Sequence, residues 1–290
     1  TRCGRDWSSD VCSSDLIRPF GDSAEKGGPG DRGGSGYADL MWHHAHRFDD
    51  PYVGWWVNQV QGWRGGSGRT SLLFDDEVPS KAPVDIAQSR VFRGVGWAGL
   101  HSDLADVDND TFFLFKSSPY GSVSHSHADQ NCFAIMKGGK ALAIPSGYYG
   151  PSYGMAHHGE WTRATKANNG VLVNGDGQVI RSAKANGHIV DFEERKGMSY
   201  VCGDATAAYM GKLERFERHV LFLRPGLILM LDDLVASEVA RFQWMLHAFE
   251  EMEVGDGQVI SRREGKTLDV RLASSEGMAL RQTDQFDTPY

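Results

Sequence analysis

From about residue 90 onwards, the sequence alternates short apolar segments with glycine-rich turns. Segments such as GVGWAGLHSD, TFFLFKSS, NCFAIM and HVLFL have the length and composition of β-strands. NCFAIM and ALAI flank Gly138-Gly139, a dipeptide typical of hairpin turns, and VLVN and GQVI flank a second turn at 174–177. We therefore expect a hairpin at each turn. Many short strands with regular turns, and no segment typical of a long helix, predict an antiparallel β-sandwich.

Two helices are predicted before this β region. The segment YADLMWHHAHRF, residues 37–48, has helical spacing, and Asp50 and Pro51 are typical of an N-cap and a first helical position for a second helix. Two helices with a short connection form an αα-hairpin. Together these patterns divide the chain into three predicted parts. They are a helical unit over 17–63, a linker over 64–88 and a sandwich over 89–290.

The first 16 residues differ from the rest of the chain. The segment DWSSDVCSSDL resembles one translated reading frame of a common short-read sequencing adapter over 11 consecutive residues, which is too long a match for coincidence. We therefore expect residues 1–16 not to be native and exclude them from predictions about the fold. The cysteines that remain, Cys132 and Cys202, are too few to define a disulfide framework.

Charge and hydropathy argue against two classes of partner. The formal net charge is −8 at pH 7, whereas binding to nucleic acid requires a basic face that neutralises phosphates. No apolar stretch approaches the roughly 20 residues that span a bilayer. We expect neither a nucleic-acid partner nor a membrane span in this chain.

Two histidines lie one residue apart in SHSHADQN, residues 124–131. In an extended segment the side chains of residues i and i+2 project to the same side, so His125 and His127 would face one site. Two imidazoles there could bind one metal ion, or one could bind a metal and the other a substrate. A pair of solvated loop histidines fits the same pattern, and the spacing alone leaves these alternatives open.

A polar segment follows, with the sequence SGYYGPSYGMAHHGEWTRATKANNG. It is poor in aliphatic residues, so a buried strand here would leave many polar groups unpaired. We expect a long surface loop, the kind of segment in which functional residues concentrate. A loop packed only on itself is the alternative. Its candidate side chains for proton transfer and sugar contact are Tyr148, Tyr149, His157, His158 and Arg163.

The order of these segments resembles a known family. SSPYGSVSHSHADQNCFAIMKGGKALAIPSGYY, followed by HHGEWTRATKANNGVLVNGDGQ, is similar to the β-sandwich domain of heparinase II/III-like polysaccharide lyases, and more similar to the alginate-lyase-like branch. The resemblance covers roughly residues 90–250, and the helices before it resemble the end of the family's (α/α) toroid. It implies a mainly β fragment. In this fragment an antiparallel β-sandwich, truncated at its C-terminus, follows a short α-helical remnant of the toroid.

The resemblance implies a carbon–oxygen lyase that cleaves uronic-acid-containing glycans by β-elimination. A base removes the proton beside the uronate carboxylate, an acid protonates the departing glycosidic oxygen, and the carboxylate is neutralised. The implied partner is an acidic polysaccharide or oligosaccharide, and the implied location is the periplasm, the cell envelope or the exterior. The fragment alone is expected to be inactive, because the family's principal tyrosine lies in the toroid.

The acidic balance favours alginate or a related polyuronate, since sulfated chains call for a more basic cleft. A glycosaminoglycan of the heparin or heparan sulfate type is one alternative substrate. A non-catalytic, carbohydrate-binding β-sandwich is the other alternative.

The resemblance also implies roles for single residues. His125 matches the family's catalytic histidine, and His127 matches a ligand of a structural metal, usually zinc. The other two ligands would fall at Pro145 and Asn168, but proline has no ligand atom and an amide oxygen is a poor partner for zinc. Zinc would therefore need a substitute ligand from His157, His158 or Asp129, and no organic cofactor is implied. The residues implied to bind substrate are Asn131, Tyr148, Tyr149, His157, His158 and Arg163.

Overall fold

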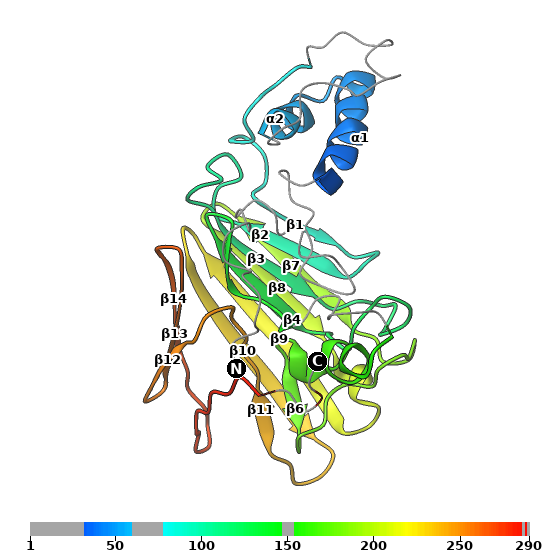
Figure 1. The fold of residues 1–290 in the computed structure, drawn as a ribbon, viewed down its shortest axis with the longest axis vertical. Helices are drawn as coiled ribbons and strands as arrows, with labels where there is room; N and C mark the ends of the chain where they lie inside the picture. Colours follow the sequence, from blue (N-terminus) through cyan, green and yellow to red (C-terminus); the bar gives the residue numbers. More distant parts are fainter. Residues whose placement is uncertain (1–31, 60–77, 147–153, 286–287, 289–290) are drawn as a thin grey trace.

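The computed structural model describes residues 32–59, 78–146, 154–285 and 288 (Figure 1). The predicted adapter segment 1–16, Tyr148 and Tyr149 lie outside the described residues. A pair of helices lies at one end of the molecule, and the β-sheets make up the remainder (Figure 1). None of the described helices is long and apolar enough to cross a membrane.

The helical pair consists of α1 (Arg32–Phe48) and α2 (Pro51–Gln59). The prediction that Asp50 caps the second helix is confirmed, because its Oδ1 accepts hydrogen bonds from the backbone nitrogens of Tyr52 and Val53, at 3.0 and 3.1 Å. The segment that begins at residue 78 contacts α2, where the backbone nitrogen of Lys81 donates to the carbonyl of Pro51 at 2.9 Å. That these helices end a toroid stays a prediction, as do the three domain boundaries.

Two antiparallel sheets form the body of the molecule. The first has five strands in chain order, β1 (Ser89–Phe92), β2 (Trp97–His101), β3 (Thr111–Lys116), β4 (Cys132–Lys137) and β5 (Lys140–Ala143). The second has the order β10-β9-β8-β7, with β7 (His188–Arg195), β8 (Met198–Asp204), β9 (Leu213–Leu223) and β10 (Leu227–Ala236). The hairpin predicted at Gly138-Gly139 is confirmed, because both glycines have positive φ and join β4 to β5.

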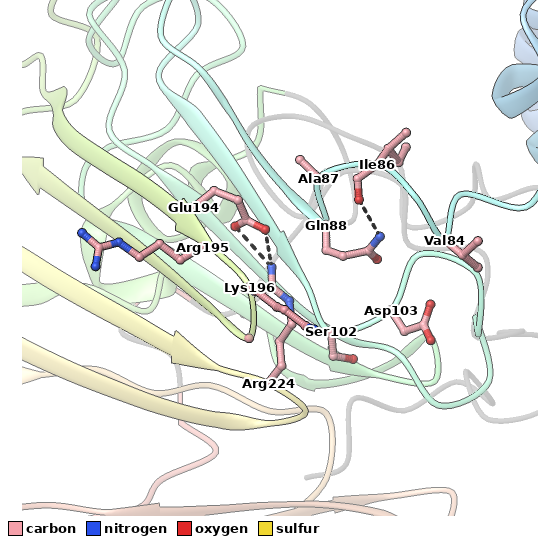
Figure 2. A pocket seen from close by; sticks show the side chains of 11 residues that line it. Val84, Ile86, Ala87, Gln88, Ser102, Asp103, Glu194, Arg195, Lys196 and Arg224 are labelled. Atoms are coloured by element: carbon pink, nitrogen blue, oxygen red, sulfur yellow. Dashed lines mark hydrogen bonds and ion pairs between the residues drawn. The ribbon is translucent and has the colours of Figure 1, made fainter.

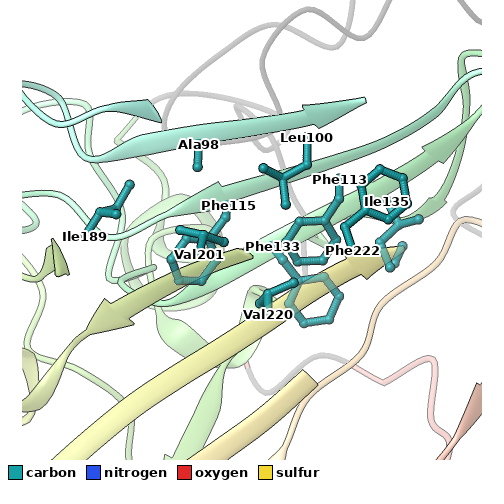
Figure 3. Packing of buried hydrophobic residues seen from close by; sticks show 11 residues of the cluster. Ala98, Leu100, Phe113, Phe115, Phe133, Ile135, Ile189, Val201, Val220 and Phe222 are labelled. Carbon is teal, nitrogen blue, oxygen red and sulfur yellow. The ribbon is translucent and has the colours of Figure 1, made fainter. Parts of the chain in front are cut away.

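The two sheets pack face to face over one apolar core (Figure 3). Alternate residues of the strands point inward, which is the period of two that the sequence showed. The buried core residues are Ala98, Leu100, Phe113, Phe115, Phe133, Ile135, Ala143, Ile189, Val201, Val220 and Phe222. The prediction of a mainly β chain with an antiparallel sandwich is confirmed.

The remaining strands form two small sheets. One pairs β6 (Val171–Val173) with β11 (Phe242–Trp244), and the other contains β12 (Glu253–Gly255), β13 (Gln258–Arg263) and β14 (Lys266–Arg271). The hairpin predicted between VLVN and GQVI is wrong, because β6 pairs with β11 and residues 177–180 form no strand. Instead, the amide of Gln178 bonds the backbone of Gln130 with both its oxygen and its nitrogen, at 2.8 and 2.7 Å.

Candidate functional site

The histidine segment is a turn rather than a strand. The backbone nitrogen of Ser126 donates to the carbonyl of Val123 at 3.0 Å, and Ser124 has a φ of 54°. His125 is exposed, whereas His127 is 2% exposed. The expectation that strand periodicity sets both imidazoles on one side is therefore wrong, because the left-handed residue and the turn break the period of two.

The residues after His127 anchor this turn in the protein. Asp129 forms a buried ion pair with Lys116, whose side chain is 4% exposed. Gln130 accepts a hydrogen bond from the backbone nitrogen of Ser118 at 2.6 Å and is fully buried. The segment therefore has a fixed, buried base at 127–131 and an exposed tip at His125.

Asn131 lies inside the protein rather than at the surface. It is 0% exposed, and its Nδ2 donates to the carbonyls of Gly203 and Phe216 at 2.8 and 3.2 Å. A Cβ atom on Gly203 would lie 2.4 Å from Oδ1 of Asn131, so the glycine makes this close approach possible. With no exposed atom, Asn131 joins the two sheets in this structure and offers nothing to a glycan, contrary to its predicted role in binding substrate.

A buried arginine that the sequence analysis did not single out supports the same region. Arg218 is 0% exposed, and its Nη1 donates to the carbonyls of Asn131 and Asn169 at 2.6 and 3.1 Å. Its Nε and Nη2 each bond the carboxylate of Asp232 at 2.6 Å. Arg218 thus joins the segments that precede β4 and β6 to β10, and Asp232 balances its charge.

Arg163 fixes the turn that carries His125. Its Nη2 donates to the carbonyls of Ser124, Ser126 and Ser122, the last two at 3.0 and 3.4 Å, and the residue is 4% exposed. The backbone nitrogen of Ala128 donates to the carbonyl of Arg163 at 2.9 Å. These contacts assign to Arg163 the role of positioning the turn.

A cavity of about 380 Å³ lies beside this turn. Its lining includes no acidic side chain among the described residues and contains two arginines and a histidine, which suits an anionic group. The lining residues are Val123, Ser124, Gly154, His158, Arg163 and Arg181.

Arg181 is a candidate that the sequence analysis missed. It is exposed, and its Nη2 lies 3.7 Å from the position that a Cβ atom would take on Gly159, next to His158. Its backbone nitrogen donates to the carbonyl of Ser122 at 3.2 Å, which ties it to the histidine turn. These tertiary contacts bring Arg181 to the cavity, and no pattern in the neighbouring sequence indicates them.

His157 and His158 are both 1% exposed. His158 begins the short helix η2 (His158–Thr162) and lines the cavity. The Nδ1 atom of His157 lies 2.5 Å from the carbonyl of Thr288, so this ring contacts the end of the chain. Of the two predicted substrate-binding histidines, His158 is the one that the structure brings to the cavity.

The segments of two of the three expected zinc positions, Pro145 and Asn168, meet, but the side chains at the three positions do not fit zinc. The backbone nitrogen of Ser146, next to Pro145, donates to the carbonyl of Ala167 at 2.7 Å. Asn168 donates its Nδ2 to the carbonyl of Ala164 at 2.8 Å, and its buried Oδ1 has no hydrogen bond within the described residues. In the described part of the chain, His127 belongs to no group of three close metal-ligating side chains. One imidazole and an amide oxygen do not make a zinc site.

A larger cavity, of about 490 Å³, lies between residues 84–88 and the turn after β7 (Figure 2). One of its two arginines, Arg224, donates from Nη2 to Glu194 at 3.0 Å and to Ser89 and Ser199, both at 2.8 Å. The cation is therefore neutralised and held in place. Among the described residues, the lining of this cavity includes no histidine, whereas His158 lines the smaller cavity beside the turn that carries His125.

Comparison with known proteins gives one family and one fold. The family model described as heparinase II/III-like, C-terminal, matches residues 86–288. The structure resembles heparan sulfate lyase HepC from Pedobacter heparinus, with a TM-score of 0.69 and 16% sequence identity over 92% of this chain and 38% of that one. It also resembles heparinase III, with a TM-score of 0.63 and 14% identity over 89% of this chain and 37% of that one. At these identities the likeness shows the fold, and the chain spans well under half the length of these relatives.

Proposed function

Because the chain belongs to the heparinase II/III-like family, we propose that it forms the β-sandwich part of a polysaccharide lyase that cleaves uronate-containing glycans by β-elimination. The observation that carries this proposal is the exposed His125 on a turn fixed by Arg163, beside a cavity without acidic side chains among its described lining residues. The proposed location is the periplasm, the cell envelope or the exterior.

His125 and Arg181 supply complementary parts of the chemistry. An exposed imidazole can act as a general acid or base, which suits proton transfer at the carbon beside the uronate carboxylate. The guanidinium of Arg181 makes no hydrogen bond or ion pair among the described residues and can bind that carboxylate in a bidentate manner. This contact stabilises the negative charge that grows as the proton leaves and the glycosidic bond breaks.

The charge of the cavity supports an unsulfated polyuronate such as alginate. The Nη2 atom of Arg163 donates to three backbone carbonyls. Arg181 is therefore the guanidinium in the cavity lining that can bind a ligand. One guanidinium matches the single carboxylate of a uronate, whereas a sulfated disaccharide carries further anionic groups. Heparan sulfate is the second candidate, and the fold of the heparan sulfate lyase from Pedobacter heparinus is the observation in its favour.

The test uses a protein of the relatives' length, in which a helical domain precedes this chain. Alginate and heparan sulfate are incubated with it separately, and the unsaturated uronate product is followed by its ultraviolet absorbance. The proposal predicts product from alginate at a higher kcat/KM than from heparan sulfate. A preference for heparan sulfate would overturn the choice of substrate.

A binding measurement on the 290-residue chain separates the enzyme from a binding module. Glycan binding without product at the longer length would support a non-catalytic, carbohydrate-binding sandwich. Absence of both product and binding with every polyuronate and glycosaminoglycan would overturn the lyase proposal as a whole.

A further inference from the structure

The outward face of the four-stranded sheet carries a cysteine, a glutamate and a histidine in one cluster. Cys202 on β8 is the register partner of His219 on β9, and Glu217 lies two residues before His219 on the same strand. Their neighbours Val201 and Val220 point into the core, so the cluster faces away from it. One ligand atom from each of the three lies within 4.8 Å of the other two. None of them lines either cavity.

The spacing of these atoms suits a tetrahedral transition-metal ion. Nitrogen and oxygen ligands at about 2.0–2.1 Å from zinc lie about 3.4 Å apart, and a thiolate at about 2.3 Å lies only slightly farther from them. The Nε2 atom of His219 is 3.8 Å from Oε2 of Glu217. Small changes of side-chain torsion therefore bring the ligand atoms to bonding distance, and the backbone need not move.

Tyr200 holds the histidine in the orientation that metal binding needs. Its hydroxyl lies 2.7 Å from Nδ1 of His219, and the two rings stack with centroids 6.2 Å apart. When Nδ1 donates its proton to this hydroxyl, the lone pair of the imidazole is on Nε2, the atom that faces Glu217. Histidines that bind metal typically donate the proton of their other ring nitrogen to a neighbouring oxygen atom.

The composition of the cluster selects the class of cation. Calcium and magnesium prefer sets of oxygen ligands, whereas thiolate and imidazole suit zinc and its neighbours among the transition metals. Glu217 and His219 have side chains that are 37% and 31% exposed, so an ion can enter from solvent and keep a water molecule. Cys202, 3% exposed, provides the buried end of the site.

We propose that Cys202, Glu217 and His219 form a binding site for a divalent cation of the zinc class, with water as the fourth ligand. On binding, the thiol releases its proton to solvent as the metal–sulfur bond forms, and no oxidation or reduction occurs. The bound ion joins β8 to β9 and stabilises the folded state by mass action. The site is independent of the lyase proposal.

The first measurement titrates the purified, chelator-treated chain with Zn²⁺ by calorimetry and with Co²⁺ as a spectroscopic probe. The expected result is one Zn²⁺ per chain and a thiolate-to-cobalt charge-transfer band. Absence of saturable Zn²⁺ binding would overturn the proposal. Cobalt bound without a thiolate band would do the same, because it would place the metal on other side chains.

Substitutions on the same sheet provide the matched comparison. Cys202→Ser, Glu217→Gln and His219→Gln should each remove the one-to-one binding, while His188→Gln and Glu214→Gln, which alter residues outside the cluster, should keep it. Tyr200→Phe should weaken Zn²⁺ binding about 10–100-fold, because it removes the hydrogen bond that orients His219. Circular dichroism checks that each variant is folded. Unchanged stoichiometry and affinity in a folded His219→Gln variant would contradict the assignment.

Discussion

Arg163 fixes the backbone on both sides of His125. The guanidinium binds the carbonyls of Ser124 and Ser126, the residues on either side of His125. The exposed imidazole therefore projects from a turn that is fixed by a buried cation. The position of a site residue at the tip of a loop is thereby fixed almost as well as if the residue lay on a strand.

Replacing Arg163 by lysine should loosen this turn. The side chain of lysine ends one bond short of the position of Nη2, so its ammonium group cannot reach the three carbonyls without moving the turn, and the free energy of unfolding should fall by about 2–4 kcal/mol. Urea denaturation measures the change. Arg181→Lys alters an exposed side chain and should stay within about 0.5 kcal/mol of the wild type. Equal stability of the Arg163→Lys variant and the wild type would contradict the role given to Arg163.

The adjacent residues Asp232 and Asp233 provide a matched test of burial. Asp232 pairs with the fully buried Arg218, whereas Asp233 pairs with Arg215, where both side chains are at least 40% exposed. Asp232→Asn leaves a buried cation without its counter-charge and should cost about 3–5 kcal/mol. Asp233→Asn should cost about 0–1 kcal/mol. Chemical denaturation of both variants checks the difference, and similar losses would argue against a buried, structural ion pair at Arg218.

His247 should make stability depend on pH. Burial lowers the pKa of His247 to about 4 from 6.5, so between these values the unfolded chain takes up a proton that the folded chain excludes. The unfolded state is therefore favoured as pH falls from 6.5 towards 4, at up to about 1.4 kcal/mol per pH unit. His247→Gln should remove the part of the pH dependence of stability that comes from this one proton. Denaturation midpoints at a series of pH values test it, and the same slope in both proteins would contradict it.

Gly203→Ala should disturb the contact between the sheets. The added Cβ would lie 2.4 Å from Oδ1 of Asn131 and 2.6 Å from the ring of Phe115. Overpacking of this kind costs about 1–3 kcal/mol. Gly94→Ala, where a Cβ would meet nothing within 4 Å, is the control and should be nearly neutral. Thermal unfolding compares the two, and equal midpoints would argue against the close approach at Asn131.

Local signals in the sequence predicted the elements whose causes are themselves local. Asp50 caps its helix because its side chain reaches nitrogens two and three residues ahead. Gly138 and Gly139 form the expected hairpin because both adopt positive φ. These interactions span a few residues, and a pattern of that length is sufficient to reveal them.

The features that could not be predicted from the sequence depend on contacts between residues that are far apart in the chain. The segment 177–180 is apolar enough for a strand, but Gln178 is held by Gln130, which lies 48 residues away. Strands β7 and β8 were not predicted, and in β7 a register shift between Ile189 and Asp191 breaks the period of two on which such a prediction depends. Arg181 reaches the cavity only through tertiary contact, which no pattern along the chain records.

The most direct test of the account compares two exposed histidines in a protein of the relatives' length. His125→Ala should reduce the rate of formation of unsaturated uronate from alginate by at least about 100-fold, since general acid–base groups contribute about 10²–10⁴. His188→Ala, an exposed histidine at the start of β7, should leave the rate unchanged. Wild-type activity in a folded His125→Ala variant would contradict the assignment of His125 to the reaction.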